Sequence, residues 1–290
     1  MNTKDHIAKA MLNGEAVVYA VRSTEIVDEL LRIHDLTPVC TAALGRTISA
    51  AAMMASDFKD EENSLSVIIK GDGPMGGLIV CADGQLNLKG YVYNNGVELP
   101  LNENGKLPVG AAIGKGTLTV VEDKGLKEPY SGSIELVTGE IAEDFAEYFM
   151  VSQQQPSAVA LGVLTDGLSV LSSSGIIVQP LPDCSDETIT EIENRIGELQ
   201  RINTIINGGK SPYEAIEHIF EGLDIKKLEE REIRFKCGCS EERIERVILS
   251  LGRDEIEDMI KDGEAEVKCS FCNTAYHFNT EALKRLLTEI

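Results

Sequence analysis

Basic side chains are scarce in this sequence. Its 290 residues include 27 lysines and arginines against 48 aspartates and glutamates, a formal charge of −21. The acidic residues are spread along the whole chain, so neither half hides a basic module. Proteins that bind nucleic acid or anionic lipid without sequence specificity usually carry a basic patch or stripe. The composition therefore argues against nucleic acid and membrane surfaces as partners.

Long hydrophobic runs are lacking as well. The most apolar stretch, AALGRTISAAAMMA, contains Arg46 and is too short to span a bilayer. The first twenty residues are interrupted by Lys4, Asp5 and Lys9 and do not have the pattern of a signal peptide. We therefore expect a cytoplasmic protein. In that compartment paired cysteines are more often metal ligands or redox groups than structural disulfides.

No complete nucleotide-binding motif is present. GDGPMG (71–76) has the glycine spacing of a dinucleotide fingerprint, but Pro74 and the following GLIVCADG predict a turn into another strand, not the required helix. GAAIGKG (110–116) resembles a phosphate loop with one residue too few, and Gly116 stands where Ser or Thr would hold magnesium. We expect no use of ATP.

No arrangement of catalytic residues stands out either, and we expect that the protein is not an enzyme. The chain has four histidines, of which His218 and His277 lie in amphipathic segments typical of packed or exposed side chains. Cys40 and Cys81 lie in apolar stretches and are predicted to be buried. Cys184 has no predicted role.

Residues 1–182 combine strand and helix patterns. Strands are predicted where β-branched or alternating runs are bounded by Gly, Asn and Asp: EAVVYAVR, SLSVIIK, GLIVCA, NLKGYVY and GTLTVVED. Helical spacing is found in TEIVDELLRIH, PVCTAALGRTISAAAMMAS and GEIAEDFAEYFMVSQQ. Turns such as NNG and ENG favour an antiparallel sheet, so the predicted fold class is α+β.

Residues 183–235 are predicted to form an amphipathic helical linker. One apolar stripe recurs at three- and four-residue steps through Ile189, Ile192, Ile196, Leu199, Ile202 and Ile206, and NGG ends it. A second helix should begin at SPYEAIEHIFEG, with Ser211 as N-cap, Pro212 in the first turn and Glu214 completing a capping box. Both helices are charged and poor in aromatic residues, so we expect them to depend on packing against another part of the chain.

Residues 236–290 contain the strongest signal in the sequence. Cys237 and Cys239 are separated by 29 residues, 240–268, from Cys269 and Cys272. Four thiolates at such spacing can complete a closed tetrahedral zinc site, and we predict one Zn²⁺ per chain. His277 could substitute as a ligand, although four cysteines suffice.

The intervening residues have clear local signals. Ser240 should cap a helix that Gly252 ends, a second helix should end at Gly263, and AEVK and AYHFN should be strands beside the second cysteine pair. A module this small buries little core, so metal must supply much of its stability.

Oxidation of this module would favour collapse over a new stable fold. Gly238 gives the backbone freedom to bring the two neighbouring sulfurs together, and neighbouring cysteines would tend to pair with each other. Such small rings are worth roughly 2 kcal/mol each, whereas zinc contributes about 10–16 kcal/mol in zinc-dependent peptides. Arg234, Lys236 and Lys268 flank the pairs and would help to keep the thiolates ionised, or they are simply attracted by the charge of the site.

The sequence resembles the redox-regulated heat-shock holdases of the 33 kDa chaperonin family along its whole length. The resemblance is carried by LTPVCTAALGRTISAAAMMA, IKGDGPMGGLIVCADGQLNLKGY, YFMVSQQQPSAVALGV, GIIVQPLP, IRFKCGCSEERIERVILSLG and VKCSFCNTAYHFN. The C-x-C and C-x-x-C pairs at this separation are specific to that family among proteins of this length, and the four cysteines show no departure from it.

This resemblance implies a stress-response chaperone with a redox-active centre. Its fold would be an N-terminal chaperone domain of layered sheets with flanking helices (1–182), a helical linker (183–235) and a C-terminal zinc redox switch (236–290). The reduced form would hold zinc on the four cysteines and be inactive. Oxidant would form the disulfides Cys237–Cys239 and Cys269–Cys272, release zinc, and unfold the C-terminal domain and destabilise the linker.

The resemblance also implies the partners. Unfolding client proteins would bind the exposed apolar surface without an ATP cycle, a dimer would form on oxidation, and clients would pass to ATP-dependent chaperones. We place part of the client surface on the linker stripe Ile189, Ile192, Ile196, Leu199 and Ile202; the same stripe could simply pack on the N-terminal domain while the protein is reduced.

Two other functions stay open at this point. A thiol-disulfide oxidoreductase would use the C-x-x-C pair, but such enzymes place it at a helix N-terminus on a βαβ unit, and here strand-like segments flank it. A structural zinc ribbon that binds a fixed partner would keep its zinc and its function after treatment with oxidant.

Overall fold

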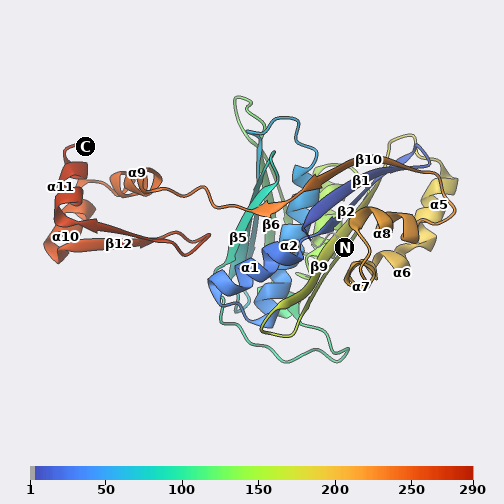
Figure 1. Ribbon diagram of the computed structural model, residues 1–290, viewed down its shortest axis with the longest axis horizontal. Helices are drawn as coiled ribbons and strands as arrows, with labels where there is room; N and C mark the ends of the chain where they lie inside the picture. The colour runs from blue at the N-terminus through green and yellow to red at the C-terminus, as the bar shows by residue number, and fades with distance from the viewer. Residues whose placement is uncertain (1–3, 290) are drawn as a thin grey trace. The chain divides into compact units, whose positions relative to one another are not determined.

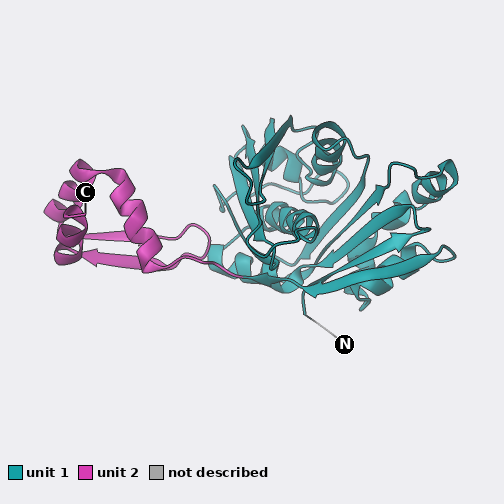
Figure 2. Ribbon diagram, turned by 90° about the horizontal axis from the view of Figure 1, so that it is seen from above, with its two compact units in different colours: residues 1–235 teal, residues 236–290 magenta. Residues whose placement is uncertain are grey.

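The computed structural model describes residues 4–289. The chain divides into two compact units, residues 1–235 and 236–290 (Figure 2). In the described part of the chain, no helix is both long enough and apolar enough to cross a membrane.

One sheet of the first unit, here called sheet A, has five strands, and each neighbouring pair is antiparallel. Its order is β10 (Ile225–Glu232), β1 (His6–Leu12), β2 (Ala16–Arg22), β9 (Val170–Pro180) and β8 (Ala158–Thr165). The central strand β2 and its neighbour β9 are buried on both faces; β2 is a nearly continuous apolar run, AVVYAV, whereas β9 has buried small residues, Ser172 to Gly175, before its apolar run Ile176 to Val178. Sheet A therefore has packed layers on both sides.

The second sheet, sheet B, has six strands. Its order is β11 (Arg234–Phe235), β5 (Asn87–Val92), β4 (Gly77–Asp83), β3 (Ser64–Gly71), β6 (Gly116–Asp123) and β7 (Tyr130–Glu135), antiparallel except for the short β11–β5 pair. Both glycine motifs lie in its connections. GDGPMG turns β3 into β4, where Gly76 and Gly77 have φ of 71° and 140°. GKG leads into β6, so neither motif opens a helix, as predicted.

Helix α2 (Pro38–Ala55) lies between the two sheets. It contacts β3, β4 and β5 of sheet B and β2, β8 and β9 of sheet A. The helix is apolar all round and rich in alanine, which suits a helix buried on every side. The other helices of this part are α1 (Thr24–His34), α3 (Val109–Ile113) and α4 (Ala142–Ser152). The predicted α+β class and layered sheets are confirmed.

Four short helices cover the face of sheet A that is turned away from α2 (Figure 1). They are α5 (Asp186–Asn194), α6 (Ile196–Leu199), α7 (Ile202–Asn207) and α8 (Pro212–Ile219). The capping box at Ser211 and Glu214 forms as predicted. The apolar stripe predicted as one helix is divided among α5, α6 and α7, with non-helical backbone at Arg195 and Arg201.

The sheet face beneath these helices is rich in alanine. Ala8, Ala10, Ala16, Ala20 and Ala160 are buried there beside Leu12, Val18, Ile176 and Val178. Most of the larger side chains come from the helices and from Phe220, which follows α8: Ile192, Leu199, Ile202, Ile205, Ile206, Ile216, Ile219 and Phe220. Bulky linker residues thus pack on a flat, alanine-rich sheet.

The segment 183–235, predicted as a helical linker, is helical only as far as Ile219. Residues 225–232 and 234–235 form strands β10 and β11 instead. The sequence IKKLEERE has good helix formers, but β10 pairs with β1 along its whole length. Tertiary hydrogen bonding here overrides local propensity.

The second unit has three helices and one hairpin among its described residues: α9 (Glu241–Leu251), α10 (Arg253–Asp262), β12 (Glu264–Lys268), β13 (Ala275–Asn279) and α11 (Thr280–Leu287). The Ser240 hydroxyl accepts the Arg243 amide and caps α9, as predicted, and α9 and α10 end at Gly252 and Gly263. Its core is small: Ile244, Ile248, Ile256, Phe278, Leu283 and Leu286 are buried.

Candidate metal centre

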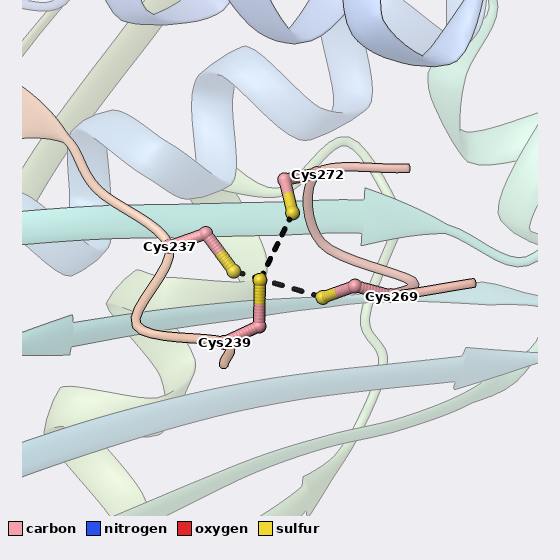
Figure 3. Close-up of side chains that lie close together, drawn as sticks. All are labelled: Cys237, Cys239, Cys269 and Cys272. Atoms are coloured by element: carbon pink, nitrogen blue, oxygen red, sulfur yellow. Dashed lines mark hydrogen bonds between the residues drawn. The ribbon is translucent and has the colours of Figure 1, made fainter. Parts of the chain in front are cut away.

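Two short loops of the second unit hold the four cysteines (Figure 3). Cys237 and Cys239 lie in the segment between β11 and α9, and Cys269 and Cys272 lie in the turn between β12 and β13. The turn is closed by two backbone bonds: the Cys269 amide donates to Thr274 at 3.0 Å, and the Asn273 amide donates to Cys269 at 2.8 Å. The hairpin therefore sets the spacing of the second pair.

The sulfur atoms of all four cysteines converge. Every Sγ lies within 4.8 Å of every other, and among residues 4–289 this is the one group of three or more close candidate ligands. Two sulfur contacts cross between the pairs: Cys237 Sγ to Cys269 Sγ is 3.6 Å, and Cys239 Sγ to Cys272 Sγ is 3.4 Å. A tetrahedral zinc site with Zn–S bonds of about 2.3 Å has sulfur–sulfur edges of about 3.8 Å. The cluster fits a metal ion of that kind.

Three neighbouring side chains support the cysteines. The Tyr276 hydroxyl donates to Cys239 Sγ at 3.1 Å, the Thr274 hydroxyl lies 3.2 Å from Cys272 Sγ, and Arg243 Nη1 donates to the Gly238 carbonyl at 2.7 Å. Donors of this sort orient metal-binding sulfurs and stabilise their negative charge.

The cysteines differ in their tendency to ionise. Burial raises the pKa of Cys237 and of Cys269 above the ordinary range of a thiol. Burial also acts to raise the pKa of Cys272, but the Thr274 hydroxyl and amide and the Cys239 thiol outweigh it and lower that pKa to about 7. The bond to Cys239 raises the pKa of Tyr276 to about 12, so its phenol stays a donor. A bound cation would favour all four thiolates.

Two of the three flanking basic residues expected from the sequence, Arg234 and Lys268, have other partners. Arg234 Nε donates to Asn87 Oδ1 at 2.8 Å, and Lys268 Nζ lies 3.3 Å from Glu266 Oε1. The sequence pointed to neither Arg243 nor Tyr276. Tyr276 is positioned by strand pairing, which no local pattern reveals, whereas Arg243 follows the Ser240 cap and lies on the first turn of α9.

The remaining cysteines and His277 do not contribute ligands to this cluster. His277 has a side chain that is 67% exposed, and its Nε2 lies 3.5 Å from Glu266 Oε2. Cys40 is buried, as predicted, and its thiol donates to the Asn94 carbonyl. The prediction that Cys81 is buried was wrong: it is only half-buried, because burial alternates along β4 and Cys81 lies on the less buried face of sheet B, beside Ser66. None of the seven cysteines forms a disulfide in this structure.

The predicted client stripe lies mostly in the core between the linker helices and sheet A. Ile192, Leu199 and Ile202 are at most 5% exposed, Ile189 is half-buried, and Ile196 is 44% exposed. In this structure the stripe therefore packs on the N-terminal residues.

Comparison with known proteins gives a consistent result. A family model described as Hsp33 protein matches residues 5–279. The 33 kDa chaperonin of Ruminiclostridium cellulolyticum is 42% identical over 95% of each chain, and that of Acetivibrio thermocellus is 44% identical over 98% of this chain and 97% of its own. The crystal structure of the 33 kDa chaperonin from Thermotoga maritima has a TM-score of 0.91 at 37% identity, covering 99% of this chain and 98% of its own.

Proposed function

The chain belongs to the Hsp33 family of chaperones, and we propose that it is a redox-regulated holdase that needs no ATP. In the reduced state Cys237, Cys239, Cys269 and Cys272 hold one Zn²⁺, and the protein is inactive. Oxidation of the four cysteines activates it to bind unfolding proteins in the cytoplasm. The observation that carries this proposal is the convergence of all four sulfurs within 4.8 Å.

The zinc would stabilise a unit that is weak without it. Among the described residues of the second unit, the apolar core has six buried side chains, and a domain of this size rarely gains more than a few kcal/mol from such a core. Structural zinc contributes about 10–16 kcal/mol in comparable peptides. Loss of the metal would therefore unfold the second unit.

Oxidation would remove the metal by consuming its ligands. Each disulfide forms from two thiolates that give two electrons to one molecule of hydrogen peroxide, which takes up two protons and becomes two molecules of water. Although Cys237 Sγ contacts Cys269 Sγ and Cys239 Sγ contacts Cys272 Sγ across the pairs, we propose the disulfides Cys237–Cys239 and Cys269–Cys272. Once the unit opens, neighbours two or three residues apart meet far more often than cysteines more than thirty apart.

The client surface would be apolar surface that the linker covers in the reduced state. Ile192, Leu199 and Ile202 become available when α5–α7 leave sheet A, and Ile189 and Ile196 extend the same stripe. Unfolded proteins would bind there by burial of apolar area. We further propose that the activated chain dimerises and that ATP-dependent chaperones later receive its clients.

The test is light scattering from a denatured client diluted into buffer with reduced, zinc-loaded protein or with peroxide-treated protein. Released zinc is measured with a chromogenic chelator in the same samples, and dithiothreitol is added at the end. We expect suppression only by the oxidised, zinc-free form, with recovery of the inactive form after reduction and zinc addition. Equal protection by both forms, or zinc retention during activation, would contradict the proposal.

A further inference from the structure

Strand β10 is charged and mostly exposed, whereas its partner β1 is mostly buried. Lys226, Lys227, Leu228, Glu229 and Glu230 are all exposed, while five of the seven residues of its partner β1 are buried and the other two are half-buried. β10 pairs only with β1 and is the edge of sheet A. Its attachment therefore depends on main-chain hydrogen bonds more than on side-chain packing.

A few side chains add to this attachment, mostly at the C-terminal half of β10. Glu230 Oε1 lies 3.2 Å from His6 Nε2, and Arg231 Nη2 donates to the Gly84 carbonyl at 2.6 Å. Ile233, directly after the strand, is buried, and its amide donates to Asp5. The pairing register also shifts between Lys9 and Ala10, where the ladder is locally disrupted.

On the face that the linker helices cover, β10 has charged side chains beside an apolar cluster, and Lys227 Nζ lies 4.9 Å from the centre of the Tyr213 ring. Ala8 and Ala10 of β1 are fully buried in the apolar cluster there, yet their partners across the ladder are Glu230 and Lys227. An extended segment with apolar residues at those two places would make the same ladder bonds and bury more apolar area.

We propose that the β1 edge, vacated by β10, is a binding site for an extended apolar segment of an unfolded client, which adds as an antiparallel strand. This inference rests on the proposed function, because β10 runs directly through Phe235 into the cysteine segment and is released with the linker. The occupant is recognised by its backbone and by alternating apolar side chains, as in strand addition generally. The edge accepts such a strand already, since β10 occupies it.

The other edges of the first unit's sheets differ from the β1 edge. β7 and β8 are edge strands in the same structure in which β10 is docked, so binding to them would not depend on the release of the linker. Release of the linker would also uncover β5, but β11 pairs with β5 at only two positions, whereas β10 pairs with β1 at seven. Among these edges, that of β1 is the long one that the release would uncover.

The test uses a labelled peptide that copies residues 223–235 with K227V and E230V. Because ladder bonds alternate and the Ile233 amide faces β1, the Arg231 amide faces β1 too, whereas the amides at 230 and 232 point away. One peptide is N-methylated at 231 and 233, and its matched control at 230 and 232. Affinity for the full chain is measured by fluorescence anisotropy before and after oxidation.

We expect binding only after oxidation, with affinity at least tenfold lower for the peptide methylated at 231 and 233 than for its control. Carboxymethylated α-lactalbumin, which stays unfolded, should displace the unmethylated peptide. Equal affinities of the two methylated peptides, or failure of displacement, would overturn the proposal. So would sedimentation data in which a second copy of the chain displaces the peptide and the unfolded protein does not.

Failure of this proposal can be told apart from failure of the proposed function. If the oxidised protein does not suppress client scattering, the holdase proposal fails. If it suppresses scattering while the two methylated peptides bind alike, clients use another surface, and only the strand-addition proposal is wrong.

Discussion

Replacement of Phe220 by alanine should activate the protein without oxidant. Phe220 follows α8, is fully buried, and packs in the cluster between the linker helices and sheet A. A buried Phe→Ala change costs about 3–5 kcal/mol, through lost transfer energy and the cavity left behind. If that cost falls on the docking of the linker, the equilibrium between the docked and the released linker shifts toward release by a factor of at least about one hundred. The reduced variant should then suppress client scattering while keeping its zinc.

The assay needs a local readout as well as activity. Hydrogen exchange should show loss of protection in α5–α8 but not in α2, which is buried between the two sheets. Leu168→Ala is the control, because that side chain is 86% exposed and its removal should change stability by no more than about 0.5 kcal/mol. The reasoning is refuted if Phe220→Ala deprotects the linker helices and the reduced protein remains inactive.

Three further predictions follow from the structure. Cys239→Ser should abolish high-affinity zinc binding, measured by competition with a chelator, whereas His277→Ala should bind zinc as the unchanged protein does; equal loss in both would place the histidine in the site. Ser211→Ala removes the N-cap of α8 and should cost about 1 kcal/mol, seen as a lower temperature for activation by peroxide; an unchanged threshold would mean that α8 is not part of the released segment. Burial raises the pKa of Asp5 from 3.8 to about 7 in the folded state. Between these two pH values the folded protein binds a proton that the unfolded chain has lost, so the free energy of unfolding falls as pH rises through this range. Asp5→Asn should reduce the difference in free energy of unfolding between pH 4.5 and pH 7.5 by on the order of 3 kcal/mol. Urea titrations at the two pH values measure this difference, and identical pH dependence of the two proteins would show that Asp5 is not the group responsible.

The parts of the fold with local signals were predictable. In the second unit, Ser240, Gly252 and Gly263 marked the helix ends correctly, because caps act within one turn. In the first unit, α1 and α2 coincide with the segments of helical spacing.

Strands that depend on distant partners were not predictable. β1, HIAKAML, contains alanines and a lysine with little β-propensity and forms a strand because β2 and β10 flank it. β10 is charged on both faces and has no alternating pattern. In each case the hydrogen bonds of a neighbour far away in sequence decide the structure.

The residues of the candidate site were also predictable only in part. The four cysteines were found from spacing alone, because sulfur ligands are rare and their separation is specific. Tyr276 and Thr274, which donate to or adjoin the sulfurs, were not found. Tyr276 comes to the cluster from strand β13 across from Val267, and neither residue type marks a metal site by itself.

The alanine-rich face of sheet A has a consequence for how selective the activated protein can be. A binding surface of long side chains must reorder its rotamers for each new ligand, at a cost of up to about 2 kcal/mol for each residue that loses its freedom. Alanine has no rotamers to reorder. Five of the nine residues that sheet A contributes to this face are alanines, Ala8, Ala10, Ala16, Ala20 and Ala160, so little of the face would need to reorder. Under the proposed function, Ile, Leu or Phe side chains from unrelated sequences would then bind there with similar free energy, and the protein would discriminate little between clients.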